Sequence, residues 1–324
     1  MSRNESIVLT DPSSGSRAEI APHLGFNCYA FRAIVDGEPI EVIDAEENFA
    51  AGQSRPSGHG IPILFPFPNR IRGGRFKWFG RSYKLPESLV GHDGNGNAIH
   101  GFCLDRPWRV TAQRGHFVVG EFQLSRDAPE RMSCWPSDCL VEVRYELRGP
   151  VLRADVRIAN TGSETLPWGF GTHPYFRLPL SPRSHPSRCL IEASAAEEWE
   201  LVNCLPTGGR CPITEAKDLR DGAYFDTLSL DDVLTGLKAE PDAVNHVIID
   251  EQAGLQVMQR CDTAFRELVV YTPRGRNAVC LEPYTCATDA INLEAQGIDA
   301  GLRTLDPGSE FHTWIEIRAG QVLA

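Results

Sequence analysis

The segment around Glu282 is the first place in this sequence where acid–base chemistry is expected. It reads Ala278-Val-Cys-Leu-Glu-Pro-Tyr284, so a carboxylate stands inside an apolar run with strand character. Burying a carboxylate is costly unless it has a partner or a catalytic role. Because Pro283 follows directly, we expect the strand to stop there and the carboxylate to lie at its rim. Glu282 is therefore the first candidate for a general base.

Two histidines lie in segments that are rich in glycine. His173 belongs to Trp168-Gly-Phe-Gly-Thr-His-Pro-Tyr-Phe176. Aromatic rings beside a histidine suit a carbohydrate site, because the C–H faces of a pyranose stack on rings; an aromatic core around a buried histidine explains the same segment equally well. His100 lies in Asn95-Gly-Asn-Ala-Ile-His-Gly-Phe102, where Gly and Asn permit unusual backbone angles. Taken alone, such a histidine is more often structural than catalytic.

A proline-rich segment, residues 60–76, precedes both histidines. Its three prolines at positions 62, 66 and 68 exclude a central paired strand. We expect this rigid, irregular segment to deliver Asn69 and Arg70 to a surface or cleft, where the guanidinium of Arg70 faces a ligand. Arg72 and Arg75 are expected to be solvated.

The elements that position these residues are mostly strands. Val141, Val143, Tyr145 and Leu147 alternate with charged residues, and after Gly149-Pro150 the alternation returns, which predicts a long antiparallel hairpin with one wet face. Further strand signals occur at 74–85, 108–124, 244–259, 267–271 and 310–318. The best helical candidate is a short piece at 231–239. We find no linker or repeat, so the expected fold is all-β, one large antiparallel β-sandwich domain over residues 1–324.

Composition limits the partners. The 324 residues are 42% hydrophobic and carry a formal net charge of −11, which fits a folded protein whose field repels nucleic acid and anionic lipid. No apolar run approaches the roughly 20 residues that span a bilayer, and the N-terminus lacks the pattern of a signal peptide. The ten scattered cysteines show no metal-ligand spacing and are expected to be reduced core residues. We expect a cytoplasmic protein that binds neither nucleic acid nor membrane, and no metal site.

The order of the motifs is similar to that of the aldose 1-epimerase (galactose mutarotase) family. The resemblance rests on five stretches in the family's order, which are Asn69-Arg-Ile71, Ile99-His-Gly101, Thr172-His-Pro-Tyr-Phe176, Leu281-Glu-Pro283 with Asp289-Ala-Ile-Asn292, and Leu305-Asp-Pro-Gly308. They span most of the chain. No single stretch is strong, but five in order are specific.

This resemblance implies a galactose-mutarotase-like supersandwich that interconverts the α and β anomers of a free aldose such as glucose or galactose. It implies no metal and no organic cofactor. Glu282 matches the base that takes the proton from the C1 hydroxyl, and His173 matches the acid that protonates the ring oxygen. Such a pair supplies the two proton transfers that opening a hemiacetal requires.

The resemblance also implies the groups that hold the sugar. Arg70 and His100 match the family's arginine and second histidine, and Asn69 stands beside them. Asp231 is the nearest match to a sugar-binding aspartate, with Asp226 and Asp232 as rivals. Tyr284 stands where the family often has glutamine, and Thr288 where it often has proline, so the sugar, like the choice between monomer and homodimer, stays open.

Three other functions compete with this one. A hexose-6-phosphate 1-epimerase on the same scaffold could use Arg70, Arg72 and Arg75 for a phosphate. A non-catalytic carbohydrate-binding or regulatory sandwich would keep the cleft without turnover. A glycoside hydrolase could use Glu282 and Asp231 as its carboxylate pair, although His173 would then have no role.

Overall fold

The predicted hairpin lies at the centre of the largest sheet. In the computed structural model, which describes residues 5–322, Leu147 pairs with Leu152 across its turn. The sheet has nine strands, in the spatial order β10 (Arg109–Arg114), β11 (Phe117–Gln123), β12 (Cys139–Arg148), β13 (Val151–Asn160), β27 (Glu310–Gln321), β23 (Leu255–Asp262), β22 (Ala243–Asp250), β17 (Cys189–Ala193) and β20 (Ala223–Tyr224). All of these pairings are antiparallel.

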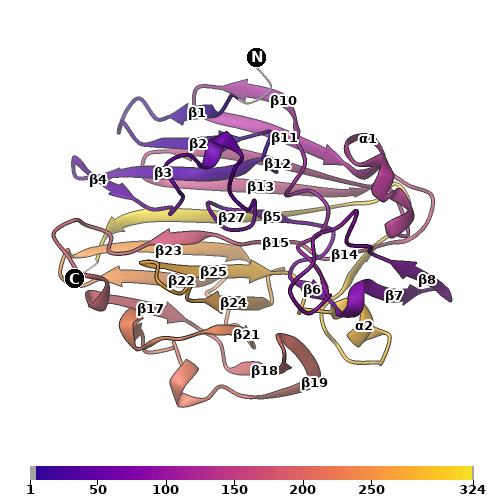
Figure 1. Ribbon diagram of the computed structural model, residues 1–324. Coiled ribbons are helices and arrows are strands. Elements are labelled where there is room, and N and C mark those ends of the chain that lie inside the picture. Colours follow the sequence, from indigo (N-terminus) through magenta and orange to yellow (C-terminus); the bar gives the residue numbers. More distant parts are fainter. Residues whose placement is uncertain (1–4, 323–324) are drawn as a thin grey trace.

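Two further sheets form the opposing layer (Figure 1). One contains β1 (Ile7–Thr10), β2 (Arg17–Ala21), β3 (Asn27–Val35) and β4 (Glu38–Glu41). The other has the order β19 (Leu205–Pro212), β18 (Glu197–Val202), β21 (Asp231–Thr235), β24 (Glu267–Tyr271), β25 (Ala278–Tyr284), β15 (Gly171–Thr172) and β5 (Ile63–Leu64), and β16 (Tyr175–Arg177) also pairs with β25. Isolated bridges from Cys28 to Ile61 and from Ile43 to Phe176 join the two sheets.

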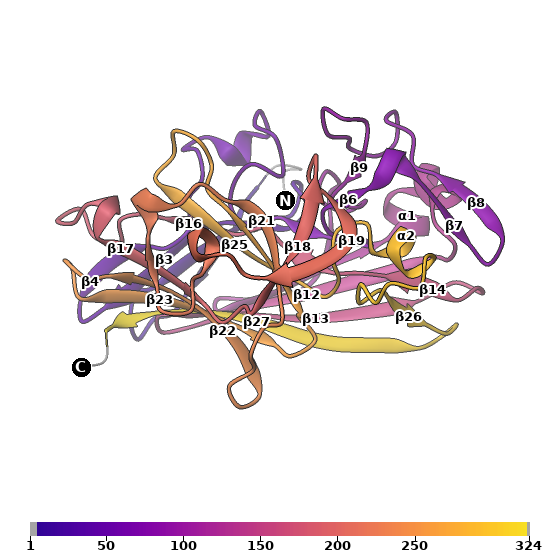
Figure 2. The ribbon, with the colours of Figure 1, turned by 90° about the horizontal axis from the view of Figure 1, so that it is seen from below.

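The main core lies between the layers, which Figure 2 shows from below. Val143 and Ile317 from the nine-stranded sheet belong to the same buried cluster as Phe31, Val270 and Leu281 from the other layer. Each strand contributes alternate side chains, since successive residues of a strand point to opposite faces. The expected all-β sandwich is confirmed.

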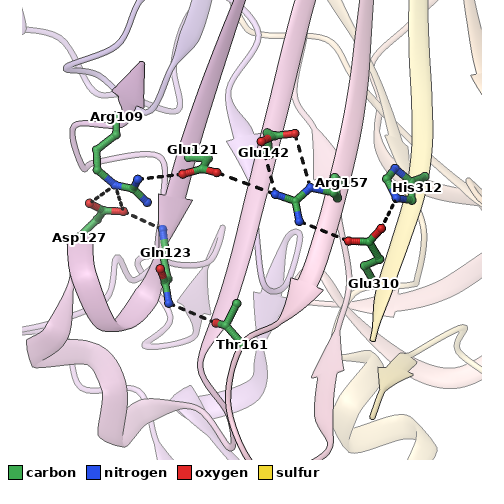
Figure 3. Close-up of polar contacts among 9 residues, drawn as sticks. All are labelled: Arg109, Glu121, Gln123, Asp127, Glu142, Arg157, Thr161, Glu310 and His312. Carbon is green, nitrogen blue, oxygen red and sulfur yellow. Dashed lines mark hydrogen bonds and ion pairs between the residues drawn. The ribbon is translucent and has the colours of Figure 1, made fainter. Parts of the chain in front are cut away.

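The outer face of the nine-stranded sheet is charged, as the hairpin pattern predicts. Arg157 lies 3.4 Å from Glu142 and 3.3 Å from Glu310, and Arg109 pairs with Glu121 at 2.8 Å and with Asp127 at 3.1 Å (Figure 3). Charges of opposite sign therefore compensate each other from strand to strand. These pairs are mostly half-buried, and together they leave the face without a patch of one sign.

Short elements complete the fold. Three two-stranded ribbons pair β6 (Arg70–Ile71) with β9 (Ala98–Ile99), β7 (Arg75–Trp78) with β8 (Arg81–Lys84), and β14 (Leu166–Trp168) with β26 (Arg303–Leu305). The α-helices are α1 (Leu124–Asp127) and α2 (Ala290–Glu294), and short 3-10 segments occupy Phe49–Ala51, Arg72–Gly74, Pro129–Cys134, Pro186–Arg188, Glu215–Lys217 and Phe225–Thr227. Within residues 5–322, no helix is long and apolar enough to cross a membrane. All ten cysteines are free thiols and eight are buried, as expected.

The helix predicted at 231–239 is wrong. Asp231–Thr235 is strand β21, which pairs with β18 on one side and β24 on the other. Val233, Leu234 and Thr235 are all buried, so the segment lacks the alternation that marks a strand with one wet face. Pairing on both edges determines its structure, and short apolar runs do not distinguish strand from helix by themselves.

The expected end of the strand at Glu282 is also wrong. Strand β25 continues through Pro283 to Tyr284, and Glu282 lies inside it with only 2% of its surface exposed. Proline fits because the ladder on one side of β25 is interrupted there. Tyr284 pairs with Gly171 and Cys280 pairs with Tyr175, and no residue is in register with 281–283 on that side.

Candidate active site

An open cleft of about 580 Å³ lies on the side of β25 that faces away from the main core. All six residues predicted for the site line it: Asn69, Arg70, His100, His173, Asp231 and Glu282. They come from five separate parts of the chain. Tertiary structure therefore brings the sequence motifs together at one place.

The alternation of β25 sets which residues reach the cleft. Val279 and Leu281 point into the main core, and Glu282 and Tyr284 lie on the opposite face and line the cleft. His173 enters from the connection between β15 and β16, which are both next to β25. This histidine lies at the gap in the ladder, opposite residues 281–283 of β25.

Glu282 and His173 are in direct contact. Nε2 of His173 lies 3.3 Å from Oε1 of Glu282, and the Tyr284 hydroxyl donates a hydrogen bond to Oε2. Each carboxylate oxygen thus has its own polar neighbour. A carboxylate and an imidazole held in this way can take up and release protons at two nearby points of a bound molecule.

Burial dominates the electrostatics of this pair. It raises the pKa of Glu282 well above its ordinary value, against the hydrogen bond from Tyr284, while the nearby Asp231 carboxylate raises it further. Burial also lowers the pKa of His173 to about 3. Burial therefore disfavours the charged form of each partner, and the hydrogen bond from Tyr284 acts against this effect at Glu282.

The imidazole of His173 is fixed by aromatic neighbours. Its ring stacks on Tyr175 with the centroids 4.7 Å apart and an angle of 8°, and Tyr271 and His100 meet it edge-on. The guanidinium of Arg276 lies 4.6 Å from the centroid of the Tyr175 ring and is itself paired with Asp44. This stack leaves His173 little freedom to turn away from Glu282.

Arg70 is oriented by two side chains. Its Nε donates to Oδ2 of Asp93 at 2.8 Å, and its Nη1 donates to Oδ1 of Asn69 at 2.7 Å. Although burial acts in the opposite direction, hydrogen bonds from Asn97 and Arg70 lower the pKa of Asp93 to about 2. Asp93 is therefore a fixed anion that holds Arg70 at the cleft.

His100 owes its position to an unusual backbone. Its φ is +65°, and that of Asn69 is +51°, while the backbone N–H of His100 donates to the Asn69 carbonyl at 2.8 Å. Gly101 follows with φ +73°, and a Cβ at that position would lie 2.1 Å from the carbonyl oxygen of Phe65. Only glycine fits there, which agrees with the unusual backbone angles predicted for this segment.

The three candidate aspartates differ in whether they line the cleft. Asp231, the first residue of β21, lines the cleft. Asp232 pairs with Lys217 at 2.9 Å, and neither it nor Asp226 lines the cleft. Arg72 and Arg75 are both exposed, as expected, and Arg72 also pairs with Asp289 and donates to the Pro206 carbonyl.

The carbohydrate-stacking interpretation of the aromatic segment is wrong for most of its rings. Trp168, Phe170 and Phe176 are 1% exposed and belong to the main core. Only Tyr175 of this segment's rings lines the cleft, and its ring is covered by His173. The alternative interpretation, an aromatic core around a buried histidine, holds for these three residues.

A family model described as aldose 1-epimerase matches residues 40–318. The chain belongs to the aldose 1-epimerase family. Among solved structures it is similar to a galactose mutarotase-like protein from Clostridium acetobutylicum, with a TM-score of 0.83 and 23% identity over 95% of this chain and 93% of the other. A putative aldose 1-epimerase from Escherichia coli K12 gives a TM-score of 0.78 and 19% identity, covering 98% of this chain and 99% of that one. The fold is thus galactose mutarotase-like.

Two curated sequence relatives match only part of this family member, and the match spans less than half of their own length. The uncharacterized proteins YphB and YihR of Escherichia coli K12 are 29% and 28% identical over 136 and 130 residues. These matches cover 42% and 40% of this chain, and 41% and 40% of the relatives.

The sequence patterns did not identify several residues that line the cleft of this aldose 1-epimerase family member. Arg55, Asp93, Tyr271 and Tyr284 line the cleft without having been assigned to it. Asp93 stands two residues before Asn95, where the segment that holds His100 begins, and this nearness was the available signal. Tyr271 ends a predicted strand, and nothing in its spacing marks it.

Proposed function

We propose that this protein interconverts the α and β anomers of a free aldose. The observation that carries the proposal is the 3.3 Å contact between His173 and Glu282 at the wall of the cleft. Ring opening of a hemiacetal needs one group that removes the proton of the C1 hydroxyl and another that protonates the ring oxygen. A buried carboxylate beside an imidazole supplies both.

In the proposed reaction, Glu282 accepts the proton from the C1 hydroxyl while His173 gives a proton to the ring oxygen. The bond between C1 and the ring oxygen breaks, and C1 becomes an aldehyde. After rotation about the C1–C2 bond, the ring oxygen attacks the other face, its proton returns to His173, and Glu282 returns its proton to the C1 oxygen. The Glu282–His173 pair thus holds one proton before and after each cycle.

The remaining predicted residues are proposed to bind the sugar. Arg70, His100 and Asn69 would donate to hydroxyl and ring oxygens from one wall, and Asp231 would accept from hydroxyl groups at the other. Arg72 and Arg75 do not line the cleft. The alternative of a hexose-phosphate substrate, in which these two arginines could join Arg70 at a phosphate, therefore loses support, which favours a free sugar.

Polarimetry tests the proposal directly. Freshly dissolved α-glucose, α-galactose and other aldoses should approach equilibrium faster with the protein than without it. The same rate should be observed after prolonged dialysis against a chelator, because both proton-transfer groups belong to the chain. No acceleration for any aldose would favour the non-catalytic binding function, and new reducing ends from a disaccharide would favour the hydrolase.

A further inference from the structure

A third potential metal ligand, Cys280, lies beside the Glu282–His173 pair. An imidazole nitrogen of His173, Sγ of Cys280 and a carboxylate oxygen of Glu282 all lie within 4.8 Å of one another, and all three residues are buried. Cys280 and Glu282 are two residues apart on β25, so their side chains share a face. Tyr175, two residues after His173, is in register with Cys280, which explains the approach of the histidine.

We infer that His173, Cys280 and Glu282 bind a thiophilic divalent cation of the Zn²⁺ class. Imidazole, thiolate and carboxylate are the three kinds of ligand that zinc takes from proteins. A thiolate in the set discriminates against Mg²⁺ and Ca²⁺, which prefer oxygen. His173 and Glu282 line the cleft, so an ion has a route to the site from solvent.

The spacing of the ligands fits such an ion after small side-chain rotations. Zinc–ligand bonds of about 2.0 to 2.3 Å in a tetrahedral arrangement place the ligand atoms roughly 3.3 to 3.8 Å apart. Nε2 of His173 and Oε1 of Glu282 already lie 3.3 Å apart. Nδ1 of His173 is buried and has no hydrogen-bond partner, so either nitrogen of the ring is available as a ligand.

Binding displaces protons and changes no oxidation state. The Cys280 thiol loses its proton to solvent and binds as thiolate, because a metal takes the deprotonated form of this ligand. The dipositive ion compensates the negative charges that would otherwise be costly at this depth. Proton release therefore accompanies occupation of the site.

The expected consequence is inhibition, and this part rests on the proposed function. The ion would occupy a lone pair of His173 and an oxygen of Glu282, the two groups proposed to move protons. Added Zn²⁺ would then stop anomer exchange, whereas removal of metal leaves the exchange intact. Occupation of the site itself can be measured without any sugar.

The test is a titration of chelator-treated protein with Zn²⁺ by calorimetry and with Cd²⁺ by ultraviolet absorption. We expect one site per chain, a thiolate-to-cadmium charge-transfer band, and proton release that appears as a heat depending on the buffer. Cys280→Ser and Cys280→Ala should lose the band and at least about 100-fold in affinity, because loss of an outer-shell partner alone costs up to that much. Cys204→Ser is the matched control, since Cys204 Sγ lies 3.8 Å from Oδ2 of Asp231 at the cleft; it should bind as the wild type does.

Absence of binding by the wild type, or unchanged affinity in the Cys280 variants, would overturn the inference. If those variants do not fold, Glu282→Gln decides, because it should keep the charge-transfer band but bind Zn²⁺ more weakly, and equal affinity would refute the site. A protein that binds Zn²⁺ at Cys280 but leaves aldoses unchanged would retain this site and refute the proposed function. An active enzyme that neither binds Zn²⁺ nor is inhibited by it would refute only the site.

Discussion

Tyr284 and His173 contact different oxygens of the Glu282 carboxylate. The Tyr284 hydroxyl donates a hydrogen bond to Oε2, and Nε2 of His173 lies beside Oε1. This bond favours the ionised carboxylate and opposes the burial that raises the pKa of Glu282. Tyr284 therefore helps to keep the proposed base in the form that accepts a proton.

Tyr284→Phe should move the pH dependence of the reaction. Without the hydroxyl, the pKa of Glu282 rises further, so the ionised base is lost at a higher pH and the acid limb of kcat/KM shifts upward by about one unit. Tyr271→Phe is the control, because Tyr271 lines the cleft without a hydrogen bond to Glu282. An acid limb at the same pH in both variants would show that Tyr284 does not tune the base.

Glu282→Gln should lower kcat by about 10²-fold or more, which is typical for loss of a general base. The amide keeps the shape of the side chain and its contact with Tyr284, so the fold should survive. Glu267→Gln, a buried glutamate on the neighbouring strand β24 outside the cleft, should leave kcat unchanged. Anomer exchange is measured by polarimetry, and near-wild-type activity of Glu282→Gln would remove Glu282 from the mechanism.

His173→Asn should depress kcat strongly with little change in KM, whereas His100→Asn should show a larger share of its effect in KM. A donor that acts only in the transition state affects kcat, and a group that also holds the ground state affects KM. The two effects need not add, because the rings are neighbours with centroids 5.6 Å apart. Steady-state kinetics on the best aldose decides, and a kcat loss confined to His100→Asn would reverse the assignment.

Asp93→Asn should raise KM by about tenfold with a smaller effect on kcat. The change removes the anion that holds Nε of Arg70, and Arg70 is proposed to bind the sugar in both ground and transition states. Asp127→Asn is the matched control, since it breaks an arginine–carboxylate pair on the outer face of the nine-stranded sheet. Equal KM values for the two variants would show that the orientation of Arg70 is unimportant.

Glu267→Gln should flatten the pH dependence of stability. Burial, opposed by a hydrogen bond from Trp199, raises the pKa of Glu267 to about 7, from about 4.3 in an unfolded chain. A raised pKa contributes stability that is complete below the unfolded value and is lost as the pH rises through about 7. Urea unfolding at pH 4.5, 6 and 8 should show a loss on the order of 3 kcal/mol in the wild type that the variant lacks. Parallel curves for the two proteins would contradict this.

Local patterns were sufficient to predict the strands with one wet face. The alternation in β12 and β13 predicted their pairing and their buried side, because a strand with one face in solvent alternates apolar and polar residues. Strand β21 has no such period, since protein covers it on both sides. The predicted end of the strand at Pro283 was wrong for a related reason. Whether a proline ends a strand depends on whether a neighbouring strand needs its N–H, and the neighbouring residues here lie more than 100 positions earlier in the chain.

The residues of the site also fall into those that local sequence predicts and those that it does not. Glu282, His173 and Arg70 were predictable because each stands in a segment whose local chemistry is unusual. Asp93 and Cys280 were not predictable, because their roles depend on residues that are distant in sequence. Asp93 is placed beside Arg70 by the fold, and Cys280 is placed beside His173. Trp168, Phe170 and Phe176 were ambiguous, because aromatic residues serve cores and sugar sites equally well.

The tight approach of Gly101 to Phe65 bears on any attempt to redesign the cleft. The wall that carries Asn69, Arg70 and His100 has two left-handed residues and a glycine with no room for a methyl group, so sequence variation there would move His100. Arg55 and Asp231 are exposed and line the cleft at other points. Libraries aimed at a new sugar preference should therefore vary positions 55 and 231 and leave residues 65–70 and 100–101 untouched.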